Sequence, residues 1–132
     1  MTALLTRRQK NEAGVYNRRA KEYDAHTADE DLIISPDAPP YPNREHVEFL
    51  DHLFGALGDP TGQRILEVGC GSGNLSTYFA MRGATAVGVD VSTGMCALAG
   101  RRAAVNGVAD RTQFIGQPIE TLDEPDGSMD AV

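Results

Sequence analysis

The apolar positions divide the chain into an irregular first part and a regular second part. From residue 64 onward, short runs of branched apolar residues alternate with segments of helical spacing. The runs at 65–68, 85–92 and 112–116 are predicted to be buried parallel strands. The segments 75–82 and 93–105 carry apolar side chains three or four positions apart, which predicts helices between those strands. This alternation predicts an α/β fold with a doubly wound parallel sheet.

The first 60 residues are more polar and are expected to form a helical cap and a linker. Residues 1–25 predict one or two helices that dock on another part of the molecule, and residues 26–44 predict a loop that contains four prolines. Asn43 is a candidate N-cap for a following helix. One face of that helix is apolar and consists of Val47, Leu50, Leu53, Phe54 and Leu57. We therefore assign residues 1–60 to the cap and linker, and residues 61–132 to the sheet domain.

The last four residues, 129–132, predict the beginning of a fourth strand, at which the sequence stops. We expect a sheet domain that is truncated there. A short strand with a free edge can pair with another chain, so self-association through this edge is an expectation.

A glycine-rich loop joins the first predicted strand to the next helix. Its glycines, Gly69, Gly71 and Gly73, let the backbone turn sharply and let a ligand approach closely. The dinucleotide pattern G-x-G-x-x-G would require a third glycine where Asn74 stands, and no Gly-Lys-Ser/Thr of a P-loop follows. Asp90 ends the second strand, where a carboxylate accepts hydrogen bonds from ribose hydroxyls. The ligand is therefore expected to contain a ribose and to need no pyrophosphate.

Three motifs resemble those of the class I S-adenosylmethionine-dependent methyltransferases. They are residues 67–73 (Glu-Val-Gly-Cys-Gly-Ser-Gly), 87–92 (Val-Gly-Val-Asp-Val-Ser) and 126–132 (Asp-Gly-Ser-Met-Asp-Ala-Val). The resemblance covers residues 64–132. It implies a Rossmann-like, three-layer fold in which strands 3, 2 and 1 and the start of strand 4 of seven are present. It also implies the cofactor S-adenosyl-L-methionine.

The resemblance further implies how the donor is held. Backbone N–H groups from Gly71 to Asn74 suit its carboxylate, Glu67 its amino group, and Asp90 both ribose hydroxyls. After the third strand, either Gln117 or Pro118 stands where the family commonly has an acid for the adenine amino group. The residues expected to bind the donor are Glu67, Gly69, Cys70, Gly71, Gly73, Asn74, Asp90, Val91, Met95, Gln117, Pro118 and Ile119.

Composition and charge limit the classes of binding partner and the cellular location that we expect. The net charge of −7 argues against a general nucleic-acid binder. Six basic residues lie within the first 21 positions, and we interpret them as a solvated helix face, with a basic arm for an anionic substrate as the alternative: Arg7, Arg8, Lys10, Arg18, Arg19 and Lys21. Two cysteines without metal-type spacing and no long apolar run favour a reducing, cytoplasmic location without a membrane span. No metal site is expected.

These observations predict a methyltransferase that acts on a small-molecule acceptor. The sequence does not identify its catalytic residues. One alternative is a donor-binding fragment without turnover that a partner chain completes. A NAD-binding oxidoreductase is a third hypothesis, which Asn74 disfavours. Tyr16 and Tyr23 are expected on a helix that closes over the donor, and residues 38–41 (Ala-Pro-Pro-Tyr) are interpreted as linker.

Overall fold

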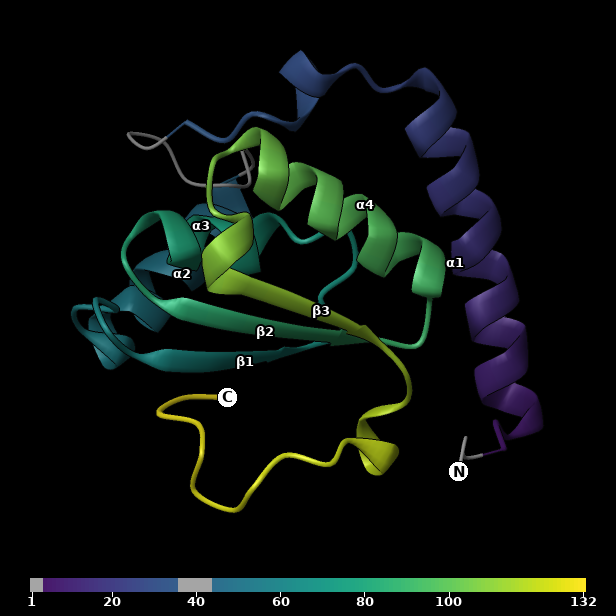
Figure 1. The fold of residues 1–132 in the computed structure, drawn as a ribbon. Coiled ribbons are helices and arrows are strands. Elements are labelled where there is room, and N and C mark those ends of the chain that lie inside the picture. Colours follow the sequence, from purple (N-terminus) through teal and green to yellow (C-terminus); the bar gives the residue numbers. More distant parts are fainter. Residues whose placement is uncertain (1–3, 36–43) are drawn as a thin grey trace.

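The computed structural model describes residues 4–35 and 44–132. The predicted N-cap Asn43 and the proline-rich residues 36–42, which include 38–41, lie outside the described residues. The helices and strands are α1 (Arg7–His26), α2 (Arg44–Leu57), β1 (Arg64–Val68), α3 (Asn74–Met81), β2 (Thr85–Asp90), α4 (Thr93–Val105) and β3 (Thr112–Gly116) (Figure 1). Short 3-10 helices span Asp29–Leu32, Ala109–Arg111 and Ile119–Thr121. None of the described helices is long and apolar enough to cross a membrane.

The three strands form one parallel sheet in the order β1-β2-β3. Ala86 of β2 aligns with Ile65 of β1 on one side and with Thr112 of β3 on the other. The middle strand is the most enclosed, since Val87 and Val89 are each 1% exposed. The predicted Rossmann-like α/β fold is confirmed, and the carboxyl ends of its strands meet at one edge of the sheet, where such folds bind ligands.

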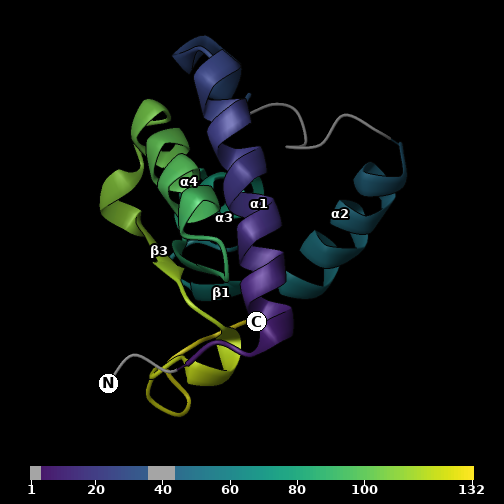
Figure 2. The ribbon, with the colours of Figure 1, turned by 90° about the vertical axis from the view of Figure 1, so that its right-hand side faces the viewer.

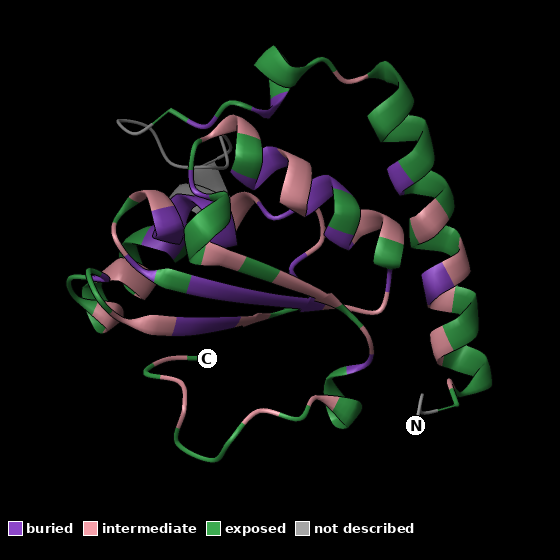
Figure 3. Ribbon diagram, in the orientation of Figure 1, coloured by how far each residue is buried: buried purple, intermediate pink, exposed green. Residues whose placement is uncertain are grey.

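The two faces of the sheet are covered by different kinds of structure (Figure 3). Helices α3 and α4 cover one face, where Ala80, Ala103 and Phe114 pack together. On the other face, Leu66, Val87 and Val89 pack against Leu122 and Met129 of the segment that follows β3. Apolar side chains on both faces of the strands explain why the strands read as continuous apolar runs.

The expected fourth strand is reduced to a single bridge. Ala131 pairs in parallel with Ile65 of β1, and the N–H of Leu66 donates to the carbonyl of Ala131 (3.0 Å). The next ladder position is interrupted because the N–H of Arg64 donates to the side chain of Asp130 (2.7 Å) instead of a backbone carbonyl. The segment nevertheless lies beside β1, as the predicted strand order requires.

Helix α2 packs its apolar face on the end of the sheet near β1. Leu53, Phe54 and Leu57 contact the cluster that contains Ile65 and Phe79. The rings of Phe54 and Phe79 lie 5.5 Å apart in an edge-on arrangement. This confirms the predicted amphipathic face for its described side chains.

Helix α1 runs beside α4 and is docked onto its first turn (Figure 2). The Oδ1 atom of Asn17 accepts hydrogen bonds from the hydroxyl of Ser92 (2.7 Å) and the N–H of Gly94 (2.9 Å). Gly94 permits this approach, because a Cβ there would lie 3.1 Å from the Cβ of Ala20. The six basic residues of the N-terminal region are all exposed, as both the solvated-face interpretation and the basic-arm alternative require, so the choice between them stays a prediction.

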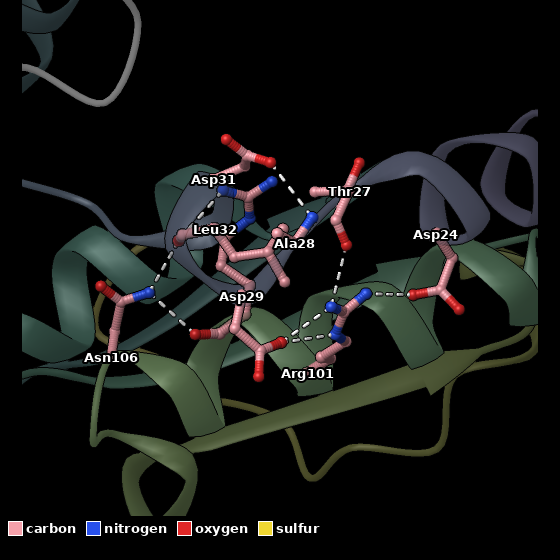
Figure 4. Close-up of polar contacts among 9 residues, drawn as sticks. Asp24, Thr27, Ala28, Asp29, Asp31, Leu32, Arg101 and Asn106 are labelled. Carbon is pink, nitrogen blue, oxygen red and sulfur yellow. Dashed lines mark hydrogen bonds and ion pairs between the residues drawn. The ribbon is translucent and has the colours of Figure 1, made fainter.

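The segment after α1 is also fixed on α4 (Figure 4). The guanidinium of Arg101 binds the carboxylates of Asp24 (2.6 Å) and Asp29 (2.7 Å) and the carbonyl of Thr27 (3.0 Å). Asn106 binds the next part of the chain, since its amide donates to the carbonyl of Leu32 (2.9 Å). The expected plain loop from residue 26 is therefore wrong at Asp29–Leu32, where acidic side chains and these contacts stabilise a turn of 3-10 helix.

Candidate functional site

A cleft of about 510 Å³ lies at the carboxyl ends of β1 and β2, next to the segment that follows β3. Most of the residues that the sequence singled out meet there. The predicted residues that line the cleft are Gly69, Gly71, Asp90, Val91, Met95, Gln117, Pro118 and Ile119. Four other predicted residues lie beside the cleft without lining it: Glu67, Cys70, Gly73 and Asn74.

The glycine-rich loop has the backbone conformation that its sequence predicts. Gly69, Gly71 and Gly73 all have positive φ angles, and that of Gly73 is 77°. Gly73 also lies tightly against α4, because a Cβ at this position would be 2.6 Å from the Cβ of Ala99. A side chain at Gly73 would therefore be excluded both by the backbone and by the neighbouring helix.

Asp90 is oriented by two backbone hydrogen bonds. Its Oδ2 accepts from the N–H of Gly71 (2.9 Å), and its Oδ1 accepts from the N–H of Ser92 (2.8 Å). A carboxylate has about four acceptor positions, so each oxygen retains capacity for one more hydrogen bond. The carboxylate is thus fixed at the cleft wall and can still accept hydrogen bonds from two ligand hydroxyls.

The backbone N–H groups of the loop are divided between internal bonds and free positions. Gly71 donates to Asp90, and Gly73 donates to the carbonyl of Cys70 (3.0 Å). The N–H groups of these two glycines are therefore engaged within the protein, and the expected role of the loop toward a donor carboxylate falls to its other N–H groups. Within the described part of the chain, Ser72 and Asn74 keep N–H groups without a partner, and Ser72 lines the cleft.

Glu67 lies at the end of β1 and holds the start of α3. Its Oε2 accepts from the N–H of Ser76 (3.0 Å) and from the Ser76 hydroxyl. Burial raises the pKa of the Glu67 carboxyl, and the bonds from Ser76 oppose that rise only in part. In this position Glu67 stabilises the loop-to-helix junction, and its expected role toward a donor amino group remains a prediction.

Cys70 points away from the cleft. It is 4% exposed and contacts the second cysteine, Cys96. Hydrogen bonding with Cys96, together with burial, raises the pKa of the Cys70 thiol, which keeps it protonated at neutral pH. Cys70 therefore fills space beneath the loop and is not activated as a nucleophile.

Three cleft residues come from α1, and the sequence indicated only one of them. Gln9, Glu12 and Tyr16 line the cleft, whereas Tyr23 does not, so the expectation for Tyr23 is wrong. Gln9, Glu12 and Tyr16 are spaced three and four residues apart, which places them on one face of the helix. That spacing is the signal that could have identified them.

The mouth of the cleft is bridged by a contact between α1 and the segment after β3. The amide nitrogen of Gln9 donates to the carboxylate of Glu120 (3.3 Å). Nearby, the amide of Gln117 donates to the hydroxyl of Thr121 (3.3 Å), which leaves its carbonyl oxygen free of this bond. Both Gln117 and Pro118 line the cleft, so neither alternative for this position is eliminated.

Carboxylates are the only ionised groups among the described residues that line the cleft: Glu12, Asp90 and Glu120. Val91, Met95 and Ile119 add an apolar part to the lining. This combination suits a ligand with a flat apolar ring, hydroxyl groups and a positive charge. Among the described residues, no group of three or more His, Cys, Asp or Glu side chains could hold a metal ion.

Comparison with known proteins assigns the family. Residues 65–132 match the family model described as a methyltransferase domain. The chain belongs to this methyltransferase domain family. The matched residues include residues 65–68 of β1, the glycine-rich loop, Asp90 and the segment after β3. These parts of the chain form the walls of the cleft other than the one from α1.

Named relatives agree with this family. The chain is 38% identical over 85 residues to the ribosomal RNA small subunit methyltransferase C of Chromohalobacter salexigens, and the match covers 64% of this chain and 24% of that protein. It is 35% identical over 92 residues to the fatty-acid O-methyltransferase of Mycolicibacterium smegmatis, covering 68% of this chain and 32% of that protein. The chain thus spans between about a quarter and a third of the length of these two relatives.

A solved structure has the same arrangement of elements. The DhpI–SAH complex is 25% identical to this chain with a TM-score of 0.58, and the match covers 89% of this chain and 48% of that one. The match extends beyond residues 65–132, so it includes part of the N-terminal region.

Proposed function

We propose that this protein binds S-adenosyl-L-methionine in the cleft and transfers its methyl group to a small-molecule acceptor. The observation that carries the proposal is Asp90, whose carboxylate is held at the end of β2 beside the glycine-rich loop with two acceptor positions left. Charge-assisted hydrogen bonds from both ribose hydroxyls would contribute roughly 1.5–3 kcal/mol each. No nucleotide phosphate is needed for this interaction.

The adenine ring fits the apolar part of the cleft. Val91 and Met95 line it from the β2–α4 side, and Ile119 lines it from the segment after β3. The free carbonyl oxygen of Gln117 can accept from the adenine amino group, which has no carboxylate partner at this position. We expect a weaker contact there than a carboxylate would make.

The methionine end of the donor fits the glycine-rich loop. The N–H groups of Ser72 and Asn74 are free, and the start of α3 adds a partial positive charge behind them. Together they suit the donor carboxylate. Asp90 and Glu120 contribute negative charge that favours the positively charged sulfonium, whereas the carboxylate of Glu12 is paired with Arg8 (2.9 Å).

When bound, S-adenosyl-L-methionine supplies a methyl group on a sulfonium that an acceptor lone pair can attack directly. The residues of this chain orient the donor and hold its charged ends, so their contribution is positioning. The described cleft residues do not include a histidine or lysine that could remove a proton from the acceptor.

A small-molecule acceptor is favoured by charge. The chain carries a net charge of −7, and the ionised groups of the cleft are all negative. Such a surface repels the phosphates of a nucleic acid. The relatives named above are described as acting on ribosomal RNA and on fatty acids, so acceptor class varies within the family.

Titration calorimetry with S-adenosyl-L-methionine and with NAD tests the donor, and a radiolabelled-methyl assay against small acceptors and RNA tests the acceptor. We expect binding of the first ligand and not of NAD, followed by methyl transfer to a small molecule. Binding of NAD alone would overturn the donor assignment. Donor binding with labelling of RNA only would overturn the acceptor assignment.

A further inference from the structure

Arg102 of α4 is a buried charge outside the cleft lining. The residue is 4% exposed, unlike its neighbour Arg101, whose side chain is 33% exposed and forms two ion pairs. The Nε of Arg102 donates to the carbonyl of Ser72 (2.9 Å), and its Nη1 donates to the carbonyl of Leu32 (3.4 Å). Within residues 4–35 and 44–132, no carboxylate pairs with Arg102. Burying a charge without an ion pair costs folding free energy, so a function of Arg102 is the natural explanation for its retention at this position.

The contact with Ser72 fixes one peptide of the glycine-rich loop at both ends. Its carbonyl accepts from Arg102, and its N–H, that of Gly73, donates to the carbonyl of Cys70 (3.0 Å). The peptide also lies close to Ala99, one turn before Arg102 on α4. The loop therefore cannot rotate this peptide without breaking a bond to a buried cation.

The second contact holds Arg102 in place. The carbonyl of Leu32 accepts from the amide of Asn106 (Figure 4). The same carbonyl accepts from Arg102, and the Leu32 side chain is fully buried. The Asn106 carbonyl oxygen in turn accepts from the N–H of Ile34 (2.9 Å). Residues 32–34 thus support the guanidinium behind the loop through these hydrogen bonds.

We propose that Arg102 is a positioning residue for the methionine end of the donor. It fixes the Ser72–Gly73 peptide, and its unpaired positive charge favours an anion on the cleft side of the loop. In a medium of low polarity such a charge acts over more than one residue layer. The inference rests on the proposed function, and it concerns the donor carboxylate alone.

The test compares two ligands that share adenosine and a thioether. S-Adenosyl-L-homocysteine carries the amino-acid end, whereas 5′-methylthioadenosine lacks it. By calorimetry we expect Arg102→Met to lower the affinity for S-adenosyl-L-homocysteine by roughly 10- to 100-fold, the range for a lost interaction with a charged group. The affinity for 5′-methylthioadenosine should fall by less than about threefold. Arg102→Lys keeps the charge with a single donor nitrogen, so its S-adenosyl-L-homocysteine affinity should fall between those of the wild type and Arg102→Met.

The control is Arg101→Met, which removes the contacts to Asp24 and Asp29 but leaves the glycine-rich loop untouched. We expect a lower melting temperature and an unchanged affinity ratio of the two ligands. Equal losses for both ligands in Arg102→Met, or no loss, would overturn the inference. If Arg102→Met does not fold, Arg102→Lys decides, and a wild-type ratio there would overturn it. Failure of the wild type to bind either ligand would instead refute the proposed function.

Discussion

Replacing Gly73 by alanine should disturb the glycine-rich loop more than any other single methyl group added to it. The backbone at Gly73 has a φ of 77°, which costs an L-residue about 1–2 kcal/mol. The added Cβ would lie 2.6 Å from the Cβ of Ala99 and 3.0 Å from its Cα. Because the Cα belongs to helix α4, the helix must move, and overpacking of this kind costs about 1–3 kcal/mol. We expect Gly73→Ala to lower the free energy of unfolding by roughly 2–5 kcal/mol.

Gly71→Ala is the matched control. Gly71 also has a positive φ, 52°, but an added Cβ meets nothing within 4 Å. Only the backbone cost of about 1–2 kcal/mol applies there. Urea denaturation followed by circular dichroism measures both values. Equal destabilisation by the two substitutions would refute the argument that α4 packs directly on Gly73.

A double mutant isolates the contact itself. Ala99→Gly removes the nearest atom at a cost of about 1 kcal/mol, since glycine is unfavourable inside a helix. The combined variant Gly73→Ala/Ala99→Gly should be more stable than the sum of the single effects by about 0.5–3 kcal/mol. Strict additivity would contradict the close approach of residues 73 and 99 in the structure.

Two further predictions concern groups that support the cleft. Because burial raises the pKa of Glu67, the favourable contribution of its protonated form to folding is complete below about pH 4.5 and is lost as the pH rises through the raised value. Glu67→Gln should therefore gain stability relative to the wild type between about pH 4.5 and 7, and a difference in unfolding free energy from urea denaturation that stays constant over this range would contradict the prediction. Asn17→Ala removes the acceptor for Ser92 and Gly94 and should lower the free energy of unfolding by about 1–2 kcal/mol. Asn17→Asp keeps an acceptor beside the positive end of α4 and should lower it by less. Equal melting temperatures for the two variants would show that this contact does not dock α1.

The elements that could be predicted from the sequence are those with local signals. Branched apolar runs predicted the strand at 112–116 with its observed bounds and four of the five residues of β1. Ser92 directly precedes α4, and its hydroxyl accepts from the N–H of Met95 (3.1 Å), a cap whose partner lies three residues away. The glycine spacing and the carboxylate of Asp90 predicted the two loops that line the cleft. Each of these depends on neighbours within one turn or one strand.

The missed features depend on contacts between distant residues. Gln9 and Glu12 reach the cleft only because Asn17 docks α1 onto Ser92, 75 residues away. Glu67 could not be assigned to Ser76 without knowing how α3 leaves the loop. The bond from Arg102 to the Ser72 carbonyl joins positions 30 residues apart. Tertiary geometry decides such pairs. Helical spacing could place Gln9 and Glu12 on one face of α1, but it could not place that face at the cleft.

The most direct test of the account is calorimetric titration of S-adenosyl-L-methionine into the wild type, Asp90→Ala and the charge control Asp110→Asn, whose exposed carboxylate lies outside the cleft lining. We predict binding to the wild type and to Asp110→Asn with the same affinity, and at least about a hundredfold loss in Asp90→Ala, which corresponds to two lost charge-assisted hydrogen bonds. Failure of the wild type to bind, or undiminished binding by folded Asp90→Ala, would contradict the assignment of this cleft to the methyl donor.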